Sequence, residues 1–310
     1  MSLRTLCAAL VLAMASPALS DAPPKPFTTQ QLSISAAPAA GSAEFKAIAE
    51  AVRGWMGQVT SGDPGKVKEA RKELSGSLRK PEATSVFHRL FFEIASPEVS
   101  KVLESGDAYH ASNALMVIRW VRTPEAFELV RQQCDARRQK DVRIRAAAAN
   151  LLPAMVDGGC VPPAQLDVAG SRLAELAASE TEWVVVAQEM TALSRLASMA
   201  SEAKMGPQAA AIRLDLIKAL GAAVKRMGDG SDKSAAPACY RGLIAVRDQV
   251  MVMSQAETAK AAEKLAPILQ QVEAIPEAKG DEVSSDELEW RGARKVADTL
   301  KKLLASRGGR

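Results

Sequence analysis

Apolar residues recur at three- and four-residue spacing along most of the chain, and short runs containing Pro, Gly, Ser or Asp separate one such segment from the next. Between residues 43 and 62, the apolar positions are Phe45, Ile48, Val52, Trp55, Met56 and Val59. This spacing puts them on one face of an α-helix. Because similar segments follow to the end of the chain, the pattern predicts an all-α protein.

Many of the breaks carry residues that begin helices. Asp63-Pro64 and Thr123-Pro124 each join a good N-cap residue to a proline, which suits the first helical position. The other expected starts are Ser42, Pro81, Ser96-Pro97-Glu98, Asp107, Pro162-Pro163, and the capping boxes Ser179/Glu182, Ser254/Glu257 and Ser284/Glu287.

The segment 141–155, DVRIRAAAANLLPAM, is central to this organisation. Asp141 is a good N-cap, and the four alanines that follow have no side chain beyond Cβ. Other helices can therefore approach closely. We expect one helix from Asp141 to Met155, packed on several sides by its neighbours.

The helices at Asp107, Asp141 and Glu182 begin 34 and 41 residues apart, a period typical of helical-hairpin repeats. The order Asp141, Val142-Arg143, Ala146-Ala147, Leu151-Leu152 resembles the HEAT-like (armadillo-type) repeat. In the other two helices, Ala108-Tyr109 and Trp183-Val184 replace Val-Arg. The resemblance is clearest over 107–200 and implies an α-solenoid, a superhelix of antiparallel helical hairpins, which the pattern extends to 81–275.

The N-terminus has the features of a secretory signal peptide. Arg4 precedes the apolar run 6–15, and small residues at Ala18 and Ser20 suit a cut after Ser20. The apolar run is much shorter than the roughly 20 residues that a membrane span needs. We expect export to the periplasm or the extracellular space of a bacterium. The expected segments are a signal peptide (1–20), a flexible linker (21–42), a capping helical hairpin (43–80), helical repeats (81–275), and an acidic linker with a basic amphipathic helix (276–310).

Composition restricts the chemistry. The 310 residues carry a net charge of +4 with both signs dispersed, which is not typical of a nucleic-acid-binding protein. No familiar catalytic or nucleotide-binding motif occurs, and His88 and His110 lack a nucleophile or carboxylate at useful spacing. No catalytic, cofactor-binding or metal-ligating set is predicted.

Three cysteines follow the signal peptide, and we expect buried free thiols at Cys134, Cys160 and Cys239. We also expect core positions for the tryptophans Trp55, Trp120, Trp183 and Trp290.

One charged cluster is a candidate binding site for a partner. Six cations lie close together around one predicted helix–helix turn, with only Asp135 and Asp141 as nearby carboxylates. An acidic partner could dock there; alternatively, the turn is simply solvated and its long side chains cover apolar surface. The six residues are Arg131, Arg137, Arg138, Lys140, Arg143 and Arg145.

Repeats without catalytic motifs favour an exported, non-catalytic scaffold that binds a protein partner in the cell envelope. Two alternatives stay open. One is an envelope glycan-acting enzyme on an α/α scaffold, which would need exposed aromatic residues and paired carboxylates. The other is attachment to a membrane surface through the amphipathic helix at 285–306, whose polar face is basic.

Overall fold

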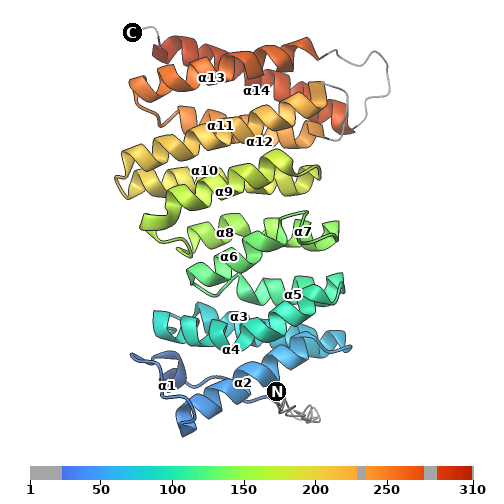
Figure 1. Ribbon diagram of the computed structural model, residues 1–310, viewed down its shortest axis with the longest axis vertical. Helices are drawn as coiled ribbons and strands as arrows, with labels where there is room; N and C mark the ends of the chain where they lie inside the picture. The colour runs from blue at the N-terminus through green and yellow to red at the C-terminus, as the bar shows by residue number, and fades with distance from the viewer. Residues whose placement is uncertain (1–22, 229–234, 276–284, 309–310) are drawn as a thin grey trace, which may run out of the picture.

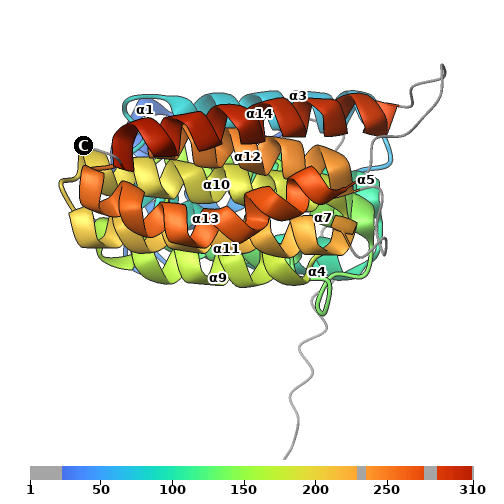
Figure 2. The same ribbon diagram turned by 90° about the horizontal axis from the view of Figure 1, so that it is seen from above.

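The helices form two layers along a single stack, as Figure 1 shows along the long axis and Figure 2 from above. The computed structural model describes residues 23–228, 235–275 and 285–308, and no β-strand occurs within them. One layer contains α2 (Ala43–Val59), α4 (Ser85–Glu104), α6 (Pro124–Gln133), α9 (Leu166–Ser179), α11 (Gly206–Gly228) and α13 (Gln255–Ala274). The other contains α3 (Pro64–Arg79), α5 (Ala108–Ile118), α7 (Val142–Ala149), α8 (Leu152–Asp157), α10 (Trp183–Glu202), α12 (Ala236–Val250) and α14 (Ser285–Gly308).

Packing follows the order of the chain. Consecutive helices pack across the layers, as α2 does with α3 and α10 with α11, while alternate helices pack within a layer, as α9 does with α11 and α10 with α12. The approach within a layer can be close: a Cβ on Gly170 of α9 would lie 2.9 Å from Cγ1 of Ile212 on α11. The expected all-α class is therefore confirmed.

Most of the predicted helix starts are confirmed. The side chains of Ser42, Asp63, Asp107 and Thr123 each accept a backbone N–H at the start of their helices. Ser254 forms the expected capping box with Glu257 at the start of α13. These side chains satisfy backbone donors that have no partner within the helix.

The expected single helix from Asp141 to Met155 is wrong. Asp141 does cap α7, with its Oδ1 2.8 Å from the Arg143 backbone nitrogen, but α7 ends at Ala149 and α8 begins at Leu152. Pro153 has no N–H to donate to the carbonyl of Ala149, and its ring crowds the preceding turn. The alanines still allow close packing, because Ala148 and Ala149 are fully buried.

Two other predicted starts are also wrong. No new helix begins at Ser96-Pro97-Glu98, because α4 runs through Pro97 without a break. A continuous apolar face that includes Phe91, Ile94, Val99 and Leu103 is buried along α4 and outweighs the lost hydrogen bond. The helix also begins at Ser85, capped by Thr84, instead of at Pro81.

Ser179 and Glu182 do not form the expected capping box. The Ser179 hydroxyl donates to the Leu176 carbonyl, and the Glu182 side chain makes no cap hydrogen bond. The carboxylate of Glu180 accepts instead, from the backbone N–H groups of Thr181 and Glu182, both at 2.9 Å.

Residues 23–42 are not the flexible linker that their composition suggested. They include the short helix α1 (Thr29–Leu32) and bury Phe27, Leu32 and Ile34. The segment is also hydrogen-bonded to the helices beneath it. The Trp55 indole N–H donates to the carbonyl of Lys25, and the Thr84 hydroxyl donates to the carbonyl of Ile34.

Several expectations lie outside the described residues. They are the signal peptide at 1–20, the acidic linker at 276–284, and the capping box at Ser284 and Glu287. The helix that follows, α14, is present, and its apolar stripe packs on α12 and α13, with Trp290, Ala293, Ala297 and Leu300 buried.

The packing of residues 23–42 can be tested at Phe27, whose ring meets the buried ring of Phe87 edge-on, with centroids 5.3 Å apart. We expect Phe27→Ala to lower the free energy of unfolding by roughly 3–5 kcal/mol, because it leaves a cavity under the segment. Denaturant unfolding measures this change. The control is Gln30→Ala at an exposed position of α1. Equal stability of the two variants would show that the segment does not pack in solution.

Candidate functional site

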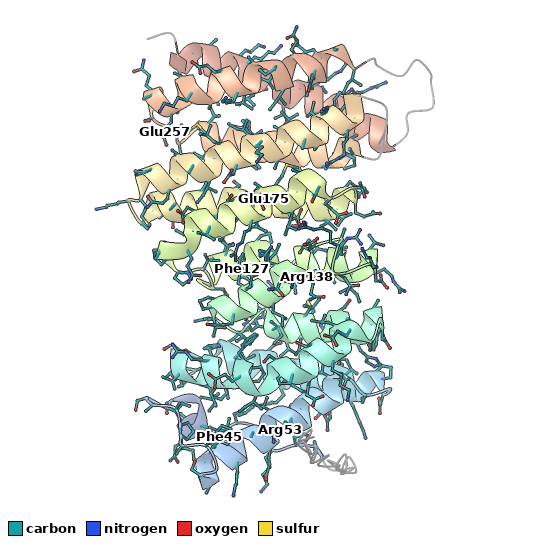
Figure 3. All side chains as sticks on the ribbon, in the orientation of Figure 1. Phe45, Arg53, Phe127, Arg138, Glu175 and Glu257 are labelled. Atoms are coloured by element: carbon teal, nitrogen blue, oxygen red, sulfur yellow. The ribbon has the colours of Figure 1, made fainter. Side chains whose placement is uncertain are left out.

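The six cations predicted as a binding cluster do not form one surface. They lie around the turn between α6 and α7, where Figure 3 labels Arg138. Arg145 is buried and Arg131 is mostly buried, whereas Arg137, Arg138, Lys140 and Arg143 are exposed. The sequence placed all six together, and the structure separates two structural cations from four accessible ones.

Arg131 is held by Glu128, one turn earlier on α6. Its Nε and Nη2 donate to the two carboxylate oxygens at 2.8 and 2.6 Å, and Gln132 donates to the same carboxylate at 2.9 Å. The hydrogen bond from Arg131 leads the causes that lower the pKa of Glu128 to about 2. The pair is therefore ionised under all ordinary conditions.

Arg145 forms a buried ion pair with Glu180. Its Nε and Nη2 donate to the carboxylate at 2.8 and 3.2 Å, and its Nη1 donates to the carbonyls of Gln139 and Lys140. Only 8% of the Arg145 side chain and 2% of the Glu180 side chain are exposed. Because Glu180 also accepts the N–H groups before α10, the pair joins the starts of α7 and α10.

The four exposed cations are already engaged with their own turn. Arg137 pairs with Asp135 at 2.9 Å, and Arg143 pairs with Asp141 at 2.6 Å. The hydrogen bond from Arg143 is the main cause that lowers the pKa of Asp141 to about 2. Arg138 donates to the side-chain oxygen of Gln132, and Lys140 donates to the carbonyl of Ala136. These bonds orient the side chains without removing them from water.

Three exposed apolar or aromatic side chains lie in the first turns of three helices near these cations. Tyr109, Val142 and Trp183 occupy the first or second position of α5, α7 and α10, with exposed fractions of 52%, 37% and 38%. The prediction that Trp183 belongs to the core is wrong, because the buried face of α10 begins with Val185 and Val186, and Trp183 lies outside it. Trp55 and Trp290 are buried as expected, and Trp120 is half-buried.

The starts of α5, α7 and α10 lie side by side. Each helix packs on the next, and the charge of Arg143 acts on Asp107, the N-cap of α5. We use the name "turn edge" for the surface made by Tyr109, Arg137, Arg138, Lys140, Val142, Arg143 and Trp183. It combines exposed aromatic, aliphatic and cationic side chains from three successive helix starts.

A groove in the other layer was not apparent from the sequence. It has a volume of about 510 Å³ and follows α6, which is shorter than its neighbours α4 and α9. Apolar side chains alternate with charged ones along it, including Phe92, Phe127, Leu129, Val168, Glu128 and Arg172. A sequence signal existed, namely the short spacing between Pro124 and the turn at Asp135.

The histidines and cysteines have structural roles, but the expectation that His110 lacks a carboxylate partner is wrong: its Nδ1 lies 2.8 Å from Oδ2 of Asp107, and its Nε2 lies 3.0 Å from the carbonyl oxygen of Ser61. His88 is buried and its Nδ1 accepts the Arg122 backbone N–H, while burial lowers its pKa to about 4. Cys134 and Cys160 are free buried thiols, as expected, and burial raises the pKa of Cys160 to about 11. Cys239 is also buried. Within the described ranges, no three His, Cys, Asp or Glu side chains are grouped to hold a metal ion.

Glu189 is an unusual buried acid. It lies on α10, fully buried, and neither carboxylate oxygen has a hydrogen-bond partner. Burial and the nearby Glu180 both raise its pKa well above the ordinary value, although Arg131 and Arg145 oppose this. The charge of Asp135 also raises the pKa of Glu189, and the charge of Glu189 raises the pKa of the Cys134 thiol. The carboxyl group therefore holds its proton to higher pH in the folded chain than in the unfolded chain.

The structural role of Arg145 predicts a large effect on stability. We expect Arg145→Met to lower the free energy of unfolding by about 3–5 kcal/mol, because Glu180 is left buried without its cation. Chemical denaturation followed by circular dichroism provides the measurement. Arg143→Met is the matched control: its ion pair is exposed, so we expect a much smaller loss of stability. If both variants are equally stable, the buried pair does not hold the stack together.

The buried Glu189 predicts a pH-dependent effect. A carboxyl group whose folded pKa is raised destabilises the fold as pH rises above its unfolded pKa of about 4.5. We expect Glu189→Gln to remove this loss, so the melting temperature of the variant relative to wild type should increase from pH 4 to pH 9. The exposed Glu175 on α9, substituted with Gln, serves as control. A difference that is constant with pH would contradict the assignment.

No known family of proteins matches the chain as a whole or in part, and no curated protein matches it in sequence. None of the helices in the described part of the chain is both long and apolar enough to cross a bilayer.

Proposed function

We propose that this protein is an exported, non-catalytic scaffold of HEAT-like helical repeats that binds a protein partner in the cell envelope. The proposed architecture is an α-solenoid of antiparallel hairpins. The two-layer succession of helices supports it, because neighbours in sequence are also neighbours in the stack. The signal-peptide pattern at residues 1–20 supports export.

The turn edge is the observation that carries the binding proposal. Repeat stacks offer extended surfaces built from equivalent positions of successive units. Val142 and Trp183 are such equivalent positions, Tyr109 lies one residue further along the first turn of α5, and all three are exposed. Tyrosine, tryptophan and arginine are enriched in protein–protein interfaces and among the residues that dominate binding energy.

The arginine side chains of the turn edge can bind a partner's carboxylates without disrupting the fold. In the Arg137–Asp135 and Arg143–Asp141 pairs, the arginine side chains are 83% and 71% exposed. Ion pairs between exposed groups contribute little to stability, because water screens the charges. A partner's carboxylates can therefore share these guanidinium groups at little cost to the fold. Arg138 and Lys140 add two cations without a carboxylate of their own.

The partner expected from this surface has an apolar side chain flanked by carboxylates. Covering Trp183 and Tyr109 would remove apolar area from water, which stabilises a complex by about 25 cal/mol per Å². The carboxylates would speed association and set orientation more than they would raise affinity. Of the residues in the turn edge, the two aromatic side chains should thus contribute most to the free energy of binding.

Affinity capture from an envelope fraction, followed by mass spectrometry, tests this proposal with three forms of the protein. The charge variant is Arg137→Glu/Arg138→Glu/Arg143→Glu, and the apolar variant is Tyr109→Ser/Trp183→Ser. We expect a protein captured by wild type to be retained at least about tenfold less by either variant, because each removes interface anchors.

The control is Arg53→Glu on α2, which lies far from Arg138 along the stack in Figure 3. It should retain the partner, and all forms should unfold at similar denaturant concentrations. A partner captured equally by every form would place binding elsewhere. Absence of any partner, together with turnover of an envelope glycan, would contradict the scaffold proposal and support the enzyme.

A further inference from the structure

A second group of cations lies at the opposite end of α5 from the turn edge. The C-terminal ends of α3 and α5 meet there, and both are followed by basic residues. The guanidinium carbons of Arg79 and Arg119 each lie 4.7 Å from the centre of the Trp120 ring. The two carbons are therefore no more than twice that distance apart. We use the name "cationic corner" for Arg79, Arg119 and Trp120 together with their exposed neighbours in sequence, Lys80 and Arg122.

The arginines of the cationic corner lack carboxylate partners. Among the described residues, none of Arg79, Arg119 and Arg122 forms an ion pair. By contrast, the two arginines of the described residues whose whole side chains are buried, Arg145 and Arg213, both have ion-pair partners. Arg145 has Glu180, and Arg213 donates to Glu257, Gln249 and Ser201.

Two buried N–H groups in this corner also lack acceptors. The Nε of Arg119 is buried without a hydrogen-bond partner. His88 accepts the Arg122 backbone N–H at Nδ1, so its neutral ring carries the proton on Nε2, which is buried and has no partner either. Each buried donor left without an acceptor destabilises the fold by about 1–3 kcal/mol.

The fold explains only part of this arrangement. Helix C-termini favour cations, and the indole face attracts guanidinium groups. Neither effect supplies an acceptor for the free guanidinium N–H groups. In the two turns at 79–84 and 119–123, four cations face only one carboxylate, that of Glu82, and Glu125 follows one turn into α6. The corner thus has an excess of positive charge and donors.

We infer that the cationic corner binds a phosphate-type oxyanion, held by Arg79, Arg119 and Arg122 beside Trp120. Guanidinium groups match the geometry of phosphate oxygens and donate to two of them at once. The indole limits the motion of two guanidinium groups before the ligand arrives, which lowers the entropy lost on binding. This site does not rest on the proposed protein partner, because it lies at the other end of α5.

Isothermal titration calorimetry of the full chain, with inorganic phosphate, with pyrophosphate and with vesicles, tests the inference. The vesicles contain phosphatidylglycerol in phosphatidylcholine, and pure phosphatidylcholine vesicles are the blank. The variant is Arg79→Gln/Arg122→Gln, in which both altered side chains are exposed, so folding should be preserved. We expect the variant to bind the active probe at least about tenfold more weakly, because charge-assisted hydrogen bonds are lost.

The matched control is Arg53→Gln/Arg241→Gln, which removes the same net charge from exposed positions on α2 and α12. It should bind like wild type. Binding of phosphate or pyrophosphate indicates a small soluble ligand, and binding only of phosphatidylglycerol vesicles indicates a lipid headgroup; both support the site. Equal weakening by the control variant, unchanged binding by the corner variant, or no binding of any probe would overturn it.

Discussion

The buried pair of Arg145 and Glu180 is the contact on which the middle of the stack depends. It lies among short helices: α6, α7 and α8 have 10, 8 and 6 residues. Short helices bury little apolar surface, so a directed polar contact has more weight there. The pair fixes the turn before α7 and, through the backbone bonds to Glu180, the start of α10.

Local chemistry explains why so much of the fold was predictable. Caps such as Asp63, Asp107 and Thr123 act within three residues of themselves, so their partners are known from sequence. The effect of a proline is harder to predict from sequence, because it depends on how much apolar surface the rest of the helix buries. Pro97 is carried through a long helix with a continuous buried face, whereas Pro153 ends a short helix that has less packing to offset it.

The candidate sites were less predictable than the helices. Sequence proximity grouped six cations, but whether a side chain is buried depends on partners 35 residues away, as with Arg145 and Glu180. The cationic corner draws Arg79 and Arg119 together across 40 positions of sequence through the packing of α3 on α5, which no local pattern indicates. Composition likewise could not reveal that residues 23–42 cover a helical core.

The short helices at the centre have a mechanical consequence. In a stack where each helix touches mainly its neighbours, stiffness varies along the axis with the area each layer buries. The longer helices α9 to α14 pack closely on one another, whereas the groove along α6 leaves the layer of α4, α6 and α9 incompletely packed. Bending of the stack should therefore concentrate at α6 and α7, close to the Arg145–Glu180 pair. Such bending would let the curvature of the turn edge adjust to a bound partner.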